Sequence, residues 1–225
     1  DYFKNTRKLR RWKSTKLRNA RAKDIEKQLK KRARSVSRSG TLWIYFGGHG
    51  YTDKEGNRFL MGIDAKSDDP TANSVELNRL IELGTKRGNR LVVIVDAGFG
   101  NTGRDGLNVL DKTDQGRPHK LPFSDPKVIV WLSDTGFGPN VSLPTAQHGL
   151  HSYLVMGALR GWADGELDNQ KDGVVSLGEA QAYVANRTLQ IGQANIPAIF
   201  PEEEAQKWPM TAHTLEEGPN DALIE

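Results

Sequence analysis

Three short, continuous runs of β-forming apolar residues constrain the fold of this chain more than any other feature. They span residues 41–46 (TLWIYF), 90–95 (RLVVIV) and 128–132 (VIVWL). Because each run is apolar at consecutive positions, each predicts a strand that is buried on both faces. Such strands need helices on both sides. The sequence therefore predicts an α/β domain with a mostly parallel central sheet and helices on both of its faces.

The segments around these runs predict helices and two further strands. Residues 74–81 predict a helix capped by Ser74, because apolar residues recur there at helical spacing. The other predicted elements are helices over residues 147–160 and 177–189, a short strand over 15–18 and an edge strand over 208–215. Strands that alternate with helices in this way are typical of a single layered α/β unit.

The length of 225 residues fits one domain, which we place at residues 1–215, followed by an acidic tail at 216–225. We find no apolar run long enough to cross a bilayer and no signal peptide, so we expect a cytoplasmic protein that does not bind a membrane. The chain has no cysteine, which excludes disulfides, thiolate metal sites and a thiol nucleophile.

Positive charge is concentrated at the start of the chain. Residues 1–38 hold 16 Lys or Arg and 3 Asp or Glu, a net charge of +13, whereas the whole chain has a net charge of +4. Ile25, Leu29 and Val36 recur there at helical spacing, which predicts an amphipathic helix. The basic side chains of residues 7–34 fit either a solvated helix face, the interpretation we prefer, or a surface that binds nucleic acid.

Two of the predicted strands end in glycine-rich sequences that hold candidate functional residues. The first strand continues into residues 46–50 (FGGHG), and the second continues into 96–100 (DAGFG). In a parallel sheet, ligands bind beyond the carboxyl ends of the strands. The glycines around His49 give its side chain little to pack against, so it is placed as a general acid or base would be. The alternative is a turn histidine that bonds a carbonyl group.

These two sequences together resemble the caspase-like cysteine peptidases, the group that contains caspases, metacaspases and their bacterial relatives. The resemblance continues at residues 148–161, and at 172–179 (DGVVSLGE) it is closest to bacterial members, so that it covers residues 15–190 in the correct order. It implies the three-layer caspase fold. The first core strand of the family has no counterpart in the chain and is expected before residue 1.

The resemblance assigns His49 as the catalytic partner and position 98 as the nucleophile. The backbone N–H groups near Gly48 and Gly98 then form the oxyanion hole. Gly98 replaces the family's cysteine, so the chain cannot form the thioester of the family mechanism. A natural pseudoenzyme, an engineered inactivation and a modified cysteine are the three origins that we consider for this glycine.

Asp96 and Asp134 are the candidate substrate-binding residues. In metacaspase-like members, the acid two places before the nucleophile lines the primary pocket and favours Arg or Lys, as a carboxylate paired with a cationic side chain would. By this resemblance Asp96 lines that pocket. The position of Asp134 after the third strand makes it a candidate for a second wall of the same pocket. The alternatives are a structural cap for Asp96 and a turn-forming role for Asp134.

Residues 168–179 resemble a calcium-binding loop of twelve residues. Asp168, Asp172, Ser176 and Glu179 fall at its first, fifth, ninth and twelfth positions, but Gln170 occupies the third, where Asp or Asn is usual. The alternative, which we prefer, is a calcium-free turn followed by a helix that Ser176 and Glu179 close as a capping box.

Two functions remain open at this point. The first is a cysteine-type endopeptidase that prefers Arg or Lys substrates, in a form without its nucleophile. The second is a natural pseudopeptidase that binds peptides or partner proteins through the same cleft. Neither function requires a cofactor, and both imply a peptide or a protein as the partner.

Overall fold

The structure is a computed structural model of the chain. It describes residues 13–102, 107–111, 115–116, 118, 121, 125–133, 141–143, 148–191, 197–201 and 208–212. Asp134 and the predicted boundary between the domain and the acidic tail at residue 216 lie outside the described residues.

A mixed six-stranded sheet forms the centre of the molecule. Its strands lie in the order β3 (Ser74–Glu76), β2 (Arg58–Met61), β1 (Thr41–Thr52), β4 (Arg90–Gly98), β5 (Val128–Leu132) and β9 (Ala198–Phe200). The three central strands β1, β4 and β5 are parallel, whereas β2, β3 and β9 pair with their neighbours in the antiparallel sense. The three apolar runs therefore form the parallel centre of the sheet, as predicted.

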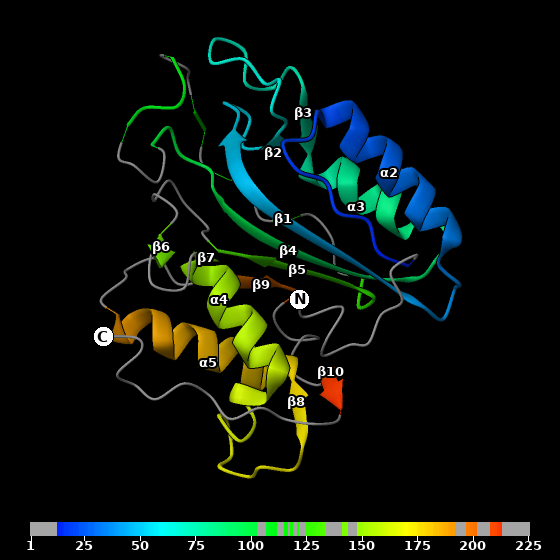
Figure 1. The fold of residues 1–225 in the computed structure, drawn as a ribbon, viewed down its shortest axis with the longest axis vertical. Helices are drawn as coiled ribbons and strands as arrows, with labels where there is room; N and C mark the ends of the chain where they lie inside the picture. The colour runs from blue at the N-terminus through cyan, green and yellow to red at the C-terminus, as the bar shows by residue number, and fades with distance from the viewer. Residues whose placement is uncertain are drawn as a thin grey trace.

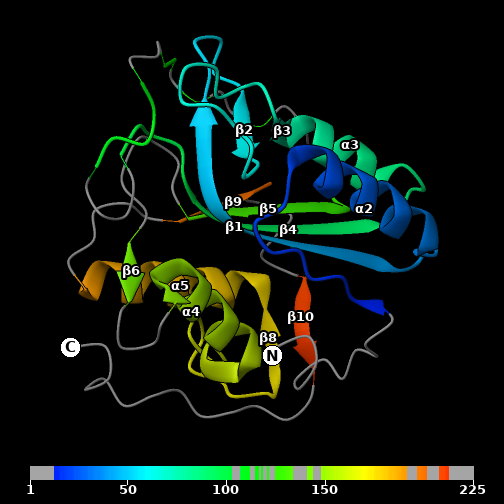
Figure 2. The same cartoon turned by 45° about the horizontal axis from the view of Figure 1, so that its top comes forward.

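Helices cover both faces of this sheet (Figures 1 and 2). On one face lie α2 (Ala22–Ser35) and α3 (Leu77–Thr85), and on the other lie α4 (Leu150–Gly157) and α5 (Leu177–Gln190). One π-helical turn, η3 (Ala158–Trp162), continues α4. The predicted α/β fold with three layers is thus confirmed.

Alternate residues of the central strands face the two helical layers. On β4, Val92 and Ile94 pack in the cluster with α4 and α5, whereas Val93 and Val95 pack in the cluster with α2 and α3. All four side chains are fully buried. This arrangement explains why the strand is apolar at consecutive positions, because each face of the sheet has its own core.

Two small sheets lie beside the α4 and α5 layer. In one, β6 (Ser142–Leu143) pairs with β7 (His148–Gly149), and in the other, β8 (Val174–Ser176) pairs with β10 (Pro209–Ala212). None of the helices in the described part of the chain is long and apolar enough to cross a membrane.

Two predictions about the N-terminal half were wrong. Residues 15–18 form no strand. Arg32 of α2 instead donates hydrogen bonds to the start of this segment, at Thr15 Oγ1 (2.6 Å) and at the Ser14 carbonyl (2.9 Å). Ser74 does not cap a helix. It lies in β3, where it pairs with Met61 of β2 and donates a 2.6 Å hydrogen bond to the Pro70 carbonyl.

Two boundaries in the C-terminal half also differ from the prediction. The helix predicted over 147–160 begins at Leu150, because His148 and Gly149 pair with β6 instead. The predicted edge strand over 208–215 is present as β10, but it pairs with β8 and is not part of the central sheet. By contrast, the basic helix and the helix over 177–189 are confirmed by α2 and α5.

Candidate active site

The register between β1 and β4 brings the two glycine-rich strand ends together. His49 and Gly98 are direct partners in this parallel pair, and Gly47 is the partner of Asp96. Partner residues on parallel strands lie about 4.8 Å apart and point to the same side of the sheet. Because Trp43 and its partner Val92 face the α4 and α5 layer, positions 49 and 98 face this layer too. A side chain at position 98 would therefore lie beside the imidazole of His49.

The ring of His49 is partly buried, and one of its two nitrogen atoms makes no hydrogen bond to a described residue. Its Nε2 atom is buried and has no hydrogen-bond partner within the described part of the chain. Burial lowers the pKa of His49 below its usual value, and a hydrogen bond with the backbone of Gly100 partly offsets this shift. The imidazole is therefore neutral at pH 7, which is the form that accepts a proton.

Glycines next to His49 allow close contacts that a side chain would block. A Cβ atom on Gly50 would lie 2.6 Å from the ring of Phe99, and one on Gly47 would lie 2.6 Å from the hydroxyl of Tyr45. Both distances are shorter than a van der Waals contact. The glycines of the FGGHG sequence thus let aromatic rings from the two strand ends pack against the backbone on either side of His49.

Asp96 is fully buried beneath this point and binds the first turn of α4. Its carboxylate accepts hydrogen bonds from the backbone N–H of Ser152, at 3.2 Å, and from the Ser152 hydroxyl. The same hydroxyl lies 2.8 Å from the hydroxyl of Tyr45 on β1. A Cβ atom on Gly149 would overlap the Asp96 carboxylate. Asp96 therefore acts as a helix cap supplied by another element, the structural alternative considered for this residue.

His151 is the second titratable side chain near Asp96. It is buried, its ring meets Trp131 of β5 edge-on with a centroid distance of 5.8 Å, and neither ring nitrogen has a hydrogen-bond partner among the described residues. Burial lowers the pKa of His151 to about 4, although the charge of Asp96 acts in the opposite direction. His151 is therefore neutral at pH 7.

Ser133 fixes the end of β5 beside the same strand. Its hydroxyl lies 3.1 Å from both the backbone N–H and the carbonyl of Ala97. Asp134, the predicted second wall of the substrate pocket, follows directly but lies outside the described residues. Its role stays a prediction.

Comparison with known proteins identifies the family. A family model described as the caspase domain matches residues 3–202. The chain belongs to the caspase family. A search among curated proteins finds no match to it.

The two strand ends correspond to the segments that hold the catalytic residues in the caspase resemblance. This caspase domain contains no cysteine anywhere, so the family's catalytic nucleophile is absent. The remaining features that the resemblance implied, His49 and the backbone near Gly48 and Gly98, lie on the two adjacent strand ends. The oxyanion-hole role of Gly48 stays a prediction.

The predicted calcium loop forms a turn whose carboxylates bind backbone groups of the chain. Asp168 accepts from Gln170 N–H at 2.9 Å, and Asp172 accepts from Val174 N–H at 2.8 Å. Ser176 and Glu179 form the capping box of α5. Within the residues that the structure describes, no three His, Cys, Asp or Glu side chains are close enough to hold a metal ion.

Glu179 is bonded through both of its carboxylate oxygens. Oε1 accepts from Gly165 N–H at 2.9 Å, and Oε2 accepts from the N–H and the hydroxyl of Ser176 at 2.8 and 2.9 Å. The side chain is also buried. These bonds engage the carboxylate that would complete a calcium site. Calcium binding by this loop stays a prediction.

Sequence reasoning missed the residues that link Asp96 to the neighbouring elements. These residues are Tyr45 on β1, Gly149 on β7, and His151 and Ser152 on α4. No local spacing in the sequence connects them to Asp96. The one local signal was the Gly149 that precedes the helix, since a glycine there permits close approach of another group.

Proposed function

We propose that this caspase domain is a pseudopeptidase, which binds a peptide in the family's cleft without forming a thioester. The observation that carries this proposal is Gly98, which is the direct partner of His49 across β1 and β4 in a chain without cysteine. Position 98 has no side chain that can attack a carbonyl carbon. Under this proposal the backbone near Gly48 and Gly98 binds the peptide.

Nearby hydroxyl groups do not substitute for the missing thiol. The Ser133 hydroxyl bonds the backbone of Ala97, and the Ser152 hydroxyl bonds Asp96 and Tyr45. Both serines are buried, and neither bonds His49. A serine nucleophile needs a base within hydrogen-bond reach, so these hydroxyl groups lack the activation that nucleophilic catalysis requires.

The second candidate function is the cysteine-type endopeptidase that a cysteine at position 98 would create. The observation that favours it is the environment of His49, whose buried, unpartnered Nε2 and lowered pKa suit a general base. Under this proposal Gly98→Cys converts the chain into a peptidase, and His49→Ala in the same variant abolishes the activity.

Preference for Arg or Lys is the finer proposal, and its support is the family resemblance at Asp96. The buried bond between Asp96 and α4 favours a structural role for that carboxylate. A panel of fluorogenic peptides with Arg, Lys, Asp or Leu before the cleaved bond tests the preference in the Gly98→Cys variant. Cleavage limited to Arg and Lys peptides supports it, and equal cleavage of Leu peptides overturns it.

The pseudopeptidase proposal is tested on the chain with Gly98. Fluorescence anisotropy of the same peptides, labelled at the N-terminus, measures binding, and mass spectrometry of the mixtures measures cleavage. We expect saturable binding with intact peptides after prolonged incubation. Cleavage of a peptide by the chain with Gly98 would contradict the proposal. It would also be contradicted if the Gly98 chain bound none of the peptides that the Gly98→Cys variant cleaves.

A further inference from the structure

We infer that α2 carries a binding surface for the phosphate backbone of nucleic acid, separate from the candidate active site. The surface, named here the basic stripe, consists of Lys23, Lys27, Lys31 and Arg34. This inference does not depend on the proposed function, because the basic stripe lies on the helical layer opposite to the one that His49 and position 98 face (Figure 1).

The helical period places the basic stripe on one side of α2. Its four members are spaced at i, i+4, i+8 and i+11, so they fall within a sector of about 80° when seen along the helix axis. All four are exposed. The opposite side holds Ala22, Leu29 and Ala33, which are buried in the core against α3 and the sheet.

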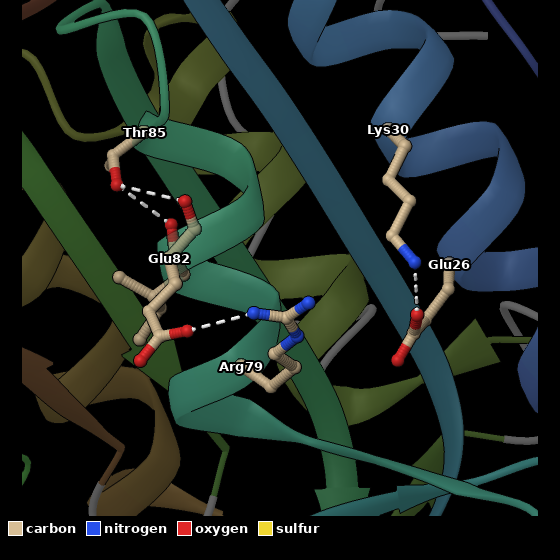
Figure 3. A network of polar contacts seen from close by, with 6 residues as sticks. Glu26, Lys30, Arg79, Glu82 and Thr85 are labelled. Atoms are coloured by element: carbon tan, nitrogen blue, oxygen red, sulfur yellow. Dashed lines mark hydrogen bonds and ion pairs between the residues drawn. The ribbon is translucent and has the colours of Figure 1, made fainter.

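The other basic residues of α2 are bound within the domain. Lys30 forms a 2.7 Å ion pair with Glu26, as Figure 3 shows, and Arg32 binds the segment at residues 14–15. The members of the basic stripe make no ion pair or hydrogen bond through their side chains with any other residue that the structure describes. The one other acid of α2 is Asp24, in its first turn. Four cations are therefore left facing solvent along one side of a folded helix.

The dimensions of the basic stripe match a nucleic-acid backbone. From Lys23 to Arg34 the helix rises about 16 Å, at 1.5 Å per residue. Duplex DNA carries one phosphate per 3.4 Å along each strand, so this length faces about five phosphates. Four exposed cationic side chains at this spacing fit a regular polyanion. Neutralising the phosphates of that polyanion releases its condensed counterions.

The composition of the exposed face disfavours a membrane as the partner. Helices that bind an anionic membrane surface add Trp, Phe or Leu beside their basic residues, so that apolar side chains enter the lipid. On α2 the residues Ile25 and Leu29 face the core, and the solvent side holds charged or polar residues. We therefore assign the basic stripe to nucleic acid.

The test compares two variants of equal net charge. Lys27→Gln/Lys31→Gln removes two cations from the basic stripe, and Lys66→Gln/Lys171→Gln removes two exposed lysines elsewhere. The probe is a labelled 20-base-pair duplex of random sequence, and its affinity is measured by anisotropy between 50 and 200 mM salt. Each phosphate contact contributes about −0.9 to the slope of log affinity against log salt. We expect the stripe variant to lose about 1.8 of this slope and the control variant to keep it.

Three results would overturn the inference. The first is the absence of salt-dependent binding of the unaltered chain to the duplex at 50 mM salt. The second is the same slope in the two double variants. The third is tighter binding to vesicles of phosphatidylserine and phosphatidylcholine than to the duplex, with loss of this vesicle binding in the stripe variant, which would assign the basic stripe to a membrane. Circular dichroism verifies that α2 is retained, since Gln has nearly the helix propensity of Lys.

Discussion

At the scale of single residues, the contact between Gly149 and Asp96 holds the start of α4 against the central sheet. Because a Cβ atom on Gly149 would overlap the buried carboxylate, we expect Gly149→Ala to lower the free energy of unfolding by about 2 kcal/mol or more. Urea unfolding of the purified chain measures this loss.

A second glycine provides the control for this substitution. Gly88 has a φ of 72°, and a Cβ atom there would meet no other atom within 4 Å. Gly88→Ala therefore introduces backbone strain without overlap, which costs about 1 kcal/mol. If Gly149→Ala cost no more than Gly88→Ala, the close packing of Asp96 against α4 would be incorrect.

His151 makes stability depend on pH at the same scale. Its pKa is about 4 in the folded state and about 6.5 in the unfolded state, so the unfolded chain binds more protons between these values. Stability therefore falls as the pH is lowered from 6.5 to 4, by about 3 kcal/mol for this group. His49, whose pKa burial also lowers, acts in the same direction.

The variant His151→Phe isolates this contribution. Phenylalanine retains an aromatic edge against Trp131 but binds no proton. We expect the difference in unfolding free energy between pH 7 and pH 4.5 to be smaller in His151→Phe than in the unaltered chain. Parallel losses in the two proteins would show that His151 does not titrate in this way.

At the scale of elements, the capping box decides where α5 begins. Ser176→Ala removes the hydrogen bond that Ser176 Oγ accepts from the Glu179 N–H and the one that the Ser176 hydroxyl donates to the Glu179 carboxylate. We therefore expect the free energy of unfolding to fall by about 1 kcal/mol. Glu179→Gln is expected to lower the free energy of unfolding by more than Ser176→Ala does. The reason is that Gln cannot accept all three of the hydrogen bonds that Gly165 and Ser176 donate to Glu179. Thermal unfolding of both variants measures which substitution destabilises the chain more.

The same melting curves test calcium binding. A ligand that binds the folded state raises the melting temperature. Because Glu179 is occupied by protein donors, we expect 5 mM calcium to leave the melting temperature unchanged relative to magnesium. If calcium raised the melting temperature by several degrees and Asp172→Asn removed this rise, the result would contradict this expectation and support a calcium-binding loop.

The elements that the sequence predicted correctly are those whose burial follows from their own composition. The run at residues 90–95 is apolar at every position after Arg90 because both faces of β4 are covered. The local sequence of Ser74 suits a helix cap, but pairing with β2 places this residue in a strand. Local propensity is overridden where a neighbouring strand offers backbone hydrogen bonds.

At the scale of the whole molecule, the parallel centre of the sheet places the two glycine-rich strand ends side by side. The family resemblance pairs His49 with position 98, and the register makes these two residues direct partners across β1 and β4. The chain from Tyr45 through Ser152 to Asp96 could not be predicted, since it joins residues up to 107 positions apart. The sequence contains no local pattern that records such a contact.

The central claim is that this molecule has the caspase arrangement with one group missing, the thiol at position 98. The most direct measurement is the rate at which iodoacetamide alkylates the single cysteine of Gly98→Cys as a function of pH, compared with Gly98→Cys/His49→Ala. Transfer of the thiol proton to an adjacent neutral imidazole gives a thiolate–imidazolium pair, which lowers the apparent pKa of the thiol below its usual value near 8.5. We predict a lowered thiol pKa in Gly98→Cys and a return toward 8.5 when His49 is removed. Identical profiles in two folded variants would contradict the account.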